Sequence, residues 1–107
     1  MKSQTNRKIR DRRTAKISVV LPVFNETAIL QELNRRIVTV LERAVTQFEI
    51  VYVNDGSSDG SYENLSALAV SDRRIGVVHL SRNFGHQPAV HAGLEHATGD
   101  VVIVMDS

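Results

Sequence analysis

The sequence predicts an α/β fold, namely a doubly wound, mostly parallel sheet with the element order β-α-β-α-β-α-β. Short runs rich in Val, Ile and Leu alternate along the chain with longer segments whose apolar residues recur at helical spacing. The strand-like runs are almost continuously apolar, as in parallel strands that are covered on both faces. Because crossovers between parallel strands are right-handed, the helices are expected to pack on both faces of this sheet.

The first strand and the first helix are predicted within residues 17–44. The run "ISVVLP" (17–22) is β-branched and closed by a proline, which is typical of a buried strand. The helical stripe of the next segment consists of Ile29, Leu30, Leu33, Ile37, Val40, Leu41 and Ala44. Glu26 suits the positive end of this helix, and the hydroxyl of Thr27 is suited to cap it.

Two further strands and two further helices are predicted before the last strand. The strands are "FEIVYVND" (48–55) and "IGVVHLS" (75–81), separated by a turn and a helix at 61–70 with Asp59 or Ser61 as its N-cap. Residues 82–88 are predicted to form a loop, and 89–97 a short helix that Gly99 ends. The last strand is "DVVIVMD" (100–106), whose outer edge we expect to be exposed.

Length and composition indicate one ordinary globular domain. The 107 residues are 42% hydrophobic and 23% charged. The chain has no cysteine, which excludes disulfides, thiolate zinc sites and cysteine nucleophiles and is compatible with a reducing cytoplasm. Its apolar runs are far shorter than the roughly 20 residues that span a bilayer. No apolar segment follows the basic N-terminus, so no secretory signal is recognised.

Positive charge is concentrated in residues 1–16, which hold seven Lys or Arg against Asp11 alone. We predict that this segment is a disordered basic arm and that residues 17–107 form the domain. An arm of this kind suits contact with an anionic membrane surface. It has no aromatic residues between its charges, and the rest of the chain is acidic, so nucleic acid is not an expected partner.

Polar residues follow each predicted strand, and the carboxyl ends of parallel strands meet at one edge of a sheet. The main ones are Pro22, Asn25, Glu26, Asp55, Arg82, Asn83, His86 and Asp106. In doubly wound sheets the ligand lies beyond this edge, where the strand order reverses. Three acids and an arginine there suit a ligand with ribose hydroxyls, a base and phosphates bridged by a divalent metal. Taken singly, Asp55 also fits a turn and Glu26 a helix start.

Several other sites are excluded by spacing. Asp55, Ser57 and Asp59 imitate half of a calcium loop, but its twelfth position is Ser66 in place of a glutamate. Neither a G-x-G-x-x-G fingerprint after the first strand nor a Walker A sequence occurs. His86, His91 and His96 recur every five residues, which does not pair them on a helix as zinc ligands.

Four segments together resemble the N-terminal half of family 2 glycosyltransferases with the GT-A fold, over residues 17–107. They are "SVVLPVFNE", "EIVYVNDGSSDGS", "LSRNFGHQPAVHAGLEHATGD" and "VVIVMDS". The branch that they resemble is that of the polyprenyl-phosphate sugar transferases, which are similar to dolichol-phosphate mannose synthase.

The resemblance assigns roles to residues at the strand ends. Pro22, Phe24 and Glu26 resemble the first nucleotide-contacting loop. Val53 and Asp55 resemble the strand end that binds base and ribose, where a carboxylate accepts from N–H and hydroxyl donors.

The resemblance extends to the last residues of the chain and to the third loop. Asp106 and Ser107 match the first two positions of an Asp-x-Asp motif, so Asp106 is expected to be a partial site for Mg²⁺ or Mn²⁺. The second aspartate would be residue 108. Arg82, Asn83 and His86 are candidates for a loop that contacts the substrate, and no catalytic residue is assigned within the chain.

The resemblance implies that the intact enzyme transfers a sugar from a UDP- or GDP-sugar to a lipid acceptor, polyprenyl phosphate, with a divalent metal. It would work at the cytoplasmic face of the membrane. The chain itself is expected to be a truncated, inactive nucleotide-binding half of that enzyme.

Two other functions fit parts of the sequence. One is a stand-alone, non-catalytic nucleotide-binding module, which would share every motif. The other is a phosphoacceptor domain with Asp55 as the acceptor, although the acidic pair and the lysine that such a domain requires are missing from the expected places.

Overall fold

The computed structural model describes residues 15–106 as one four-stranded sheet with three helices. Along the chain these are β1 (Lys16–Val23), α1 (Thr27–Ala44), β2 (Gln47–Asn54), α2 (Ser61–Ser71), β3 (Ile75–His79), α3 (His86–His96) and β4 (Val101–Val104). The strand order is β3-β2-β1-β4, and every strand pair is parallel. The predicted α/β fold and its element order are confirmed.

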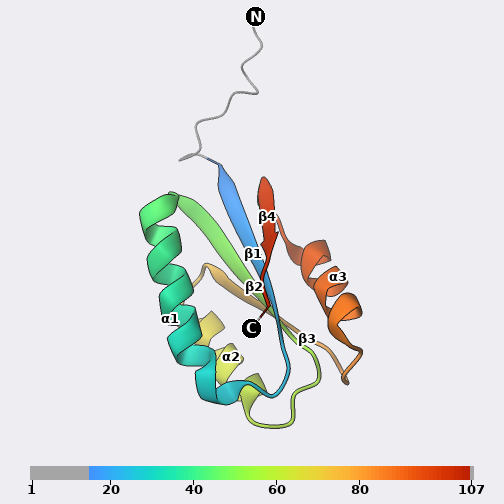
Figure 1. Cartoon of the computed structure of the whole chain (residues 1–107). Coiled ribbons are helices and arrows are strands. Elements are labelled where there is room, and N and C mark those ends of the chain that lie inside the picture. The colour runs from blue at the N-terminus through green and yellow to red at the C-terminus, as the bar shows by residue number, and fades with distance from the viewer. Residues whose placement is uncertain (1–14, 107) are drawn as a thin grey trace, which may run out of the picture.

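The helices cover both faces of the sheet, as right-handed crossovers require. The chain runs from β1 through β2 to β3 in one direction and then returns to place β4 on the other side of β1. For this reason α1 and α2 pack on one face and α3 packs on the opposite face (Figure 1). The reversal of strand order, and with it the switch point, therefore lies between β1 and β4.

The hydrophobic core has two parts, one on each face of the sheet, and the larger part lies between the sheet and the helices α1 and α2. Leu30, Ile37 and Leu41 are the buried residues of α1. Ile29 and Val40, which the spacing also assigned to the apolar stripe, are exposed. The predicted stripe was too wide, because a helix that lies on one sheet turns only part of its circumference toward the core.

The smaller half of the core, between the sheet and α3, depends on close approach of the helix. Gly93 of α3 faces Val20 and Val53, and a Cβ at this glycine would lie 2.4 Å and 2.9 Å from their methyl groups. Figure 1 shows α3 lying alongside β1 and β4. Glycine here lets α3 approach the sheet at a distance that alanine would not allow.

The predicted ends of α3 were wrong at both sides. The helix begins at His86, within the predicted loop 82–88, because Pro88 occupies the first helical turn, where its missing N–H is not needed. It ends at His96 with Ala97 in extended conformation, so Gly99 does not end it. Gly99 instead lies against β1, where a Cβ would be 2.5 Å from the hydroxyl of Ser18.

The boundary between arm and domain also differs slightly from the prediction. Lys16, assigned to the basic arm, is the first residue of β1 and pairs with Gln47 of β2. Residues 1–14 of the predicted arm, and Ser107, lie outside the described residues. Within residues 15–106, none of the helices has the length and apolar character needed to cross a membrane.

Candidate functional site

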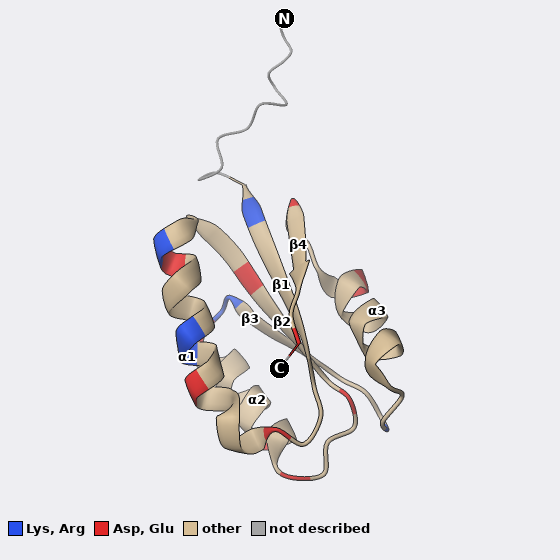
Figure 2. Cartoon of the chain, in the orientation of Figure 1, with Lys and Arg blue, Asp and Glu red and all other residues tan. Residues whose placement is uncertain are grey.

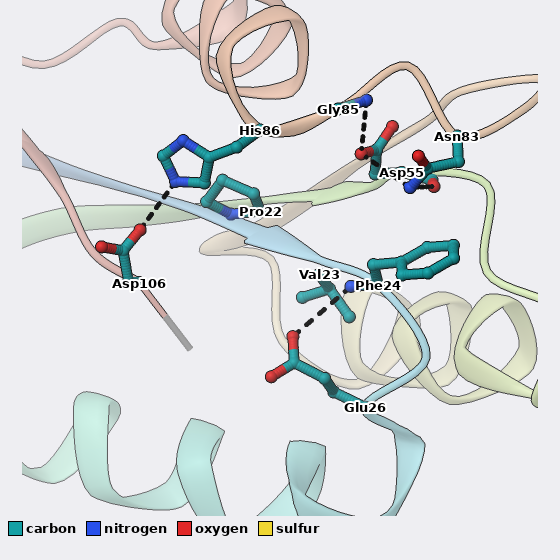
Figure 3. Close-up of a pocket in the computed structure, with 9 residues that line it drawn as sticks. All are labelled: Pro22, Val23, Phe24, Glu26, Asp55, Asn83, Gly85, His86 and Asp106. Carbon is teal, nitrogen blue, oxygen red and sulfur yellow. Dashed lines mark hydrogen bonds and ion pairs between the residues drawn. The ribbon is translucent and has the colours of Figure 1, made fainter.

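A cavity of about 600 Å³ lies at the carboxyl ends of the strands, beside the switch point (Figure 3). All four strands or the segments that follow them contribute to its wall. The lining residues are Pro22, Val23, Phe24, Glu26, Asp55, Asn83, Gly85, His86 and Asp106. Six of the predicted strand-end residues are therefore brought together with Phe24 in one cavity, as the doubly wound topology requires.

Negative charge predominates around this cavity. Figure 2 shows acidic positions in the loops that follow β1 and β2 and beside the C-terminus. The lining carboxylates are those of Glu26, Asp55 and Asp106, whereas none of the Lys and Arg residues within 15–106 lines the cavity. An anionic ligand in this cavity therefore needs a cation with it, and the acidic wall is suited to hydroxyl and N–H donors.

The loop after β1 places Phe24 and Glu26 at the cavity, and Asn25 holds that loop in shape. Asn25 adopts the left-handed region with φ of 52°. Its amide donates to the hydroxyl of Ser57 at 2.9 Å, and its side-chain oxygen accepts from the amide of Ser58 at 2.8 Å. The loops that follow β1 and β2 are thus joined to each other beside the cavity.

Asp59 joins the same two loops by accepting hydrogen bonds at the start of two helices. Its carboxylate accepts from the amide of Thr27 in α1 and from the amide and hydroxyl of Ser61 in α2. The hydroxyl of Ser61 and the amide of Thr27 hold the pKa of Asp59 below its usual value. The predicted cap of α1 by Thr27 was wrong, because the residue at the N-cap is Glu26 and the first amide is bound by Asp59.

Asp55 is buried, with 4% of its surface exposed, and its carboxylate binds the segment that precedes α3. Oδ1 accepts from the amide of Phe84 at 2.8 Å, and Oδ2 accepts from the amide of Gly85 and the side-chain amide of Asn83, each at 3.1 Å. Such a buried, bonded carboxylate does not fit a phosphoacceptor, which must be reached by its phosphate donor.

The side chain of Val53 does not line the cavity, and the role of this residue at the nucleotide stays a prediction. Val53 is fully buried and packs with Val20 and Ala89 in the core beneath α3. The alternation of side chains along a strand turns this residue toward the helix. Its side chain thus supports α3 from below the cavity.

The neighbouring Asn54 is a structural residue that sequence reasoning missed. Its side-chain oxygen accepts from the amide of Ser57 at 3.0 Å, and its amide nitrogen lies 3.1 Å from Nδ1 of His79. Burial lowers the pKa of His79, which also stacks on Tyr62 with 4.0 Å between ring centroids. An asparagine directly before Asp-Gly was the available signal, since asparagine side chains commonly order the turn that follows them.

His86 and Asp106 meet at the mouth of the cavity. His86 Nε2 lies 2.7 Å from Oδ1 of Asp106, and both side chains are largely exposed. Within residues 15–106 there is no group of three or more His, Cys, Asp or Glu side chains that could hold a metal ion. Asp106 therefore offers one carboxylate toward a divalent metal, and the described residues alone do not form a complete metal site.

Arg82, which was also predicted at the site, lies apart from the cavity wall. The guanidinium of Arg82 lies 4.3 Å from the ring centroid of Phe84 in the segment before α3, and Arg82 does not line the cavity. Ser107 lies outside the described residues. Val23 and Gly85 line the cavity although sequence reasoning did not assign them to the site; their positions next to Pro22 and His86 were the available signal.

The family model described as Glycosyl transferase family 2 matches residues 18–107. Among curated proteins, "Uncharacterized glycosyltransferase YkcC" of Bacillus subtilis (strain 168) is 39% identical over 90 residues, covering 84% of this chain and 28% of that protein. The "Prophage bactoprenol glucosyl transferase homolog" of Escherichia coli (strain K12) is 44% identical over 91 residues, with 85% and 30% covered.

A third relative is the "Undecaprenyl-phosphate 4-deoxy-4-formamido-L-arabinose transferase" of Sodalis glossinidius. It is 44% identical over 93 residues, covering 86% of this chain and 28% of the relative. The chain thus spans less than a third of the length of these curated relatives.

Solved structures show the same fold. A mannosyltransferase, PcManGT from Pyrobaculum calidifontis in complex with GDP-Man and Mn²⁺, superposes with a TM-score of 0.72 at 24% identity, covering 86% of this chain and 27% of that structure. TarS of S. aureus superposes with a TM-score of 0.68 at 28% identity, with 85% and 16% covered. These superpositions confirm the predicted fold, which is that of the N-terminal half of a glycosyltransferase domain.

Proposed function

This chain belongs to glycosyl transferase family 2, and from that membership we propose that residues 17–107 bind the nucleotide sugar of a glycosyltransferase. The enzyme would transfer a sugar from a UDP- or GDP-sugar to a lipid acceptor, polyprenyl phosphate. The cavity at the switch point is the main support, because it unites Phe24, Glu26 and Asp106 with the carboxylate of Asp55. A cavity of that size and composition suits a nucleoside with its hydroxyl and N–H donors.

Each lining residue has a chemical reason to contact a nucleotide sugar. The partly exposed ring of Phe24 offers an apolar face to a base or a ribose. The carboxylates of Glu26 and Asp55 accept hydrogen bonds from hydroxyl or N–H donors. Asp106 would supply one oxygen ligand to Mg²⁺ or Mn²⁺, which screens the diphosphate from the acidic wall and stabilises the leaving group.

The lipid acceptor is proposed from the names of the relatives. A bactoprenol glucosyl transferase homolog and an undecaprenyl-phosphate sugar transferase match this chain at 44% identity. Use of a polyprenyl phosphate would place the active site at the cytoplasmic face of the membrane. The basic residues 1–16 would suit an anionic surface there, although 1–14 lie outside the described residues.

Calorimetric titration of UDP and of GDP into the chain, with and without Mn²⁺, tests the nucleotide site. We expect one nucleotide to bind more tightly than the other, and the Glu26→Gln variant to bind it more weakly. Glu63→Gln, which removes an exposed carboxylate in the first turn of α2, is the matched control and should bind like the original chain. A folded chain that binds neither nucleotide would contradict the proposal.

Transfer itself is tested on the protein expressed from its complete coding sequence. Incubation with undecaprenyl phosphate and a radiolabelled sugar nucleotide should move label into the lipid phase. Nucleotide binding without any transfer to lipid, over a panel of UDP- and GDP-sugars, would instead favour the non-catalytic nucleotide-binding module.

A further inference from the structure

We propose that Asp55 is a positioning residue whose buried carboxylate holds the 82–86 segment against the end of β2 and thereby sets His86 opposite Asp106. Its effect on ligand binding rests on the proposed nucleotide site, whereas its effect on the segment does not. Figure 3 shows Asp55 below Asn83 and Gly85, and His86 directed toward Asp106. Asp55 thus connects the interior of the sheet to the mouth of the cavity.

Three donors of the segment bind the carboxylate of Asp55. Two are consecutive backbone amides, those of Phe84 and Gly85, and the side-chain amide of Asn83 also reaches the backbone oxygen of Asp55 at 3.2 Å. Phe84 is exposed and Gly85 half-buried, but both amides donate to the buried carboxylate, so these two hydrogen bonds last only while the carboxylate stays in place. The segment therefore owes part of its position to one side chain.

Close packing of the backbone at Gly56 also holds the segment before α3 against the end of β2, without any polar side chain. Gly56 follows Asp55 with φ of +72°, and a Cβ there would lie 2.3 Å from the carbonyl carbon of Arg82 and 2.4 Å from the amide nitrogen of Asn83. The chain after β2 and the chain before α3 are thus in direct backbone contact. Only glycine fits such an approach, because any side chain would push the two segments apart.

The held segment leads directly into α3. Gly85, at φ of 103°, is the N-cap of the helix, and its carbonyl accepts from the amide of Ala89 at 3.1 Å. The next residue is His86, which reaches Asp106 across the mouth of the cavity. A shift of the 83–85 backbone therefore moves the first residue of α3 and separates the two groups. Asp55 acts on His86 through this path.

Amide hydrogen exchange measured by NMR on the ligand-free chain tests the contact directly. In Asp55→Asn, whose new NH₂ group replaces one acceptor, at least one of the amides of Phe84 and Gly85, which bind different oxygens, should exchange about tenfold faster or more. The amide of Leu80, bonded to the carbonyl of Asn54, is the internal reference and should not change. Glu26→Gln is the matched control, since it removes another carboxylate of the same cavity. Unchanged exchange at Phe84 and Gly85 in Asp55→Asn overturns the proposal.

A second variant covers the case in which Asp55→Asn does not fold. Asn83→Ala removes one donor from the exposed segment and leaves the carboxylate intact. The Gly85 amide, which shares Oδ2 with Asn83, should then exchange a few-fold faster, and no change there would count against the contact.

Measurements of nucleotide affinity distinguish a positioning role of Asp55 from an effect of Asp55 on the stability of the whole chain. If Asp55 also acts through His86, beyond its own contact with the nucleotide, the losses of UDP or GDP affinity in Asp55→Asn and His86→Ala should be clearly less than additive in the double variant. Additive losses would mean that Asp55 affects affinity only through its own contact, and would overturn the path through His86. If the original chain binds neither nucleotide, the proposed function fails while the exchange data still decide the role of Asp55.

Discussion

His86 Nε2 and Asp106 Oδ1 lie 2.7 Å apart, although twenty residues separate them and one begins α3 while the other follows β4. They meet because β4 returns to the far side of β1, which brings its end beside the start of α3. Both side chains are well exposed, at 59% for His86 and 80% for Asp106. A pair this exposed contributes little to the stability of the fold. We therefore expect it to affect metal and nucleotide binding at the cavity.

Asp106→Asn tests this view of the pair. We expect the stability of the chain to change by no more than about 1 kcal/mol, because exposed ion pairs are screened by water. The increase in nucleotide affinity that Mn²⁺ produces should be lost, since a neutral amide is a poor metal ligand. Calorimetry with and without Mn²⁺, together with urea unfolding, measures both effects.

Glu95→Gln is the control for that experiment, because it removes a similarly exposed carboxylate that lies 3.4 Å from His91 on the same helix. It should leave both stability and the Mn²⁺ effect unchanged. A Mn²⁺ effect that survives in Asp106→Asn would remove Asp106 from the proposed metal ligands.

Gly93→Ala should destabilise the chain by about 1–3 kcal/mol in urea unfolding, in spite of the better helix propensity of alanine. The new methyl group would meet Val20 and Val53, whose branched side chains have few alternative rotamers. Gly76→Ala in β3 is the matched control, because nothing lies within 4 Å of a Cβ there. Equal stability of the two variants would show that α3 can move away from the sheet without cost.

Glu49 gives a pH dependence of stability with a definite sign. Burial favours a higher pKa for Glu49, but hydrogen bonds from the hydroxyl of Ser18 and from Thr98 outweigh it and hold the pKa below 4.5. A carboxyl whose pKa is lowered by folding contributes stability above its unfolded pKa, and this contribution is lost as the pH falls through the folded pKa. The free energy of unfolding should therefore fall as the pH drops below about 4.5.

Glu49→Gln isolates that contribution. The variant should be less stable than the original chain at pH 7, and the difference between the two should shrink as the pH falls to 3. Urea unfolding at several pH values measures this difference. A difference that stays constant from pH 7 to pH 3 would mean that the charge of Glu49 contributes nothing.

The outer edge of β4 should make the 107-residue chain self-associate. Within residues 15–106, β4 pairs with β1 alone, and all four of its apolar side chains are exposed. Ile103→Lys should raise the monomer fraction measured by light scattering after size-exclusion chromatography, because an edge lysine opposes strand pairing. Val70→Lys, at an isolated exposed site on α2, should leave it unchanged. Equal association of both variants would exclude the edge as the contact.

The sequence by itself determined the order of elements, the parallel sheet and the edge at which the site lies. These follow from local periodicity and from the handedness of crossovers, which act on every chain of this pattern. It also identified most residues of the cavity, including Glu26, Asp55 and Asp106, because strand ends are readable where apolar runs stop. The boundaries of α3 were less readable, since Pro88 is typical of a loop but is equally accepted in the first turn of a helix, where it lies.

Only the tertiary structure decided what each of these side chains does. Val53 and Asp55 are two residues apart and were assigned together, yet one is fully buried under α3 and the other binds the amides of Phe84 and Gly85. Likewise Asp59, expected only as a cap of its own helix, also binds the first amide of α1. These partners lie about thirty residues away in the chain. Contacts at such separations depend on how the elements pack, which local sequence patterns do not encode.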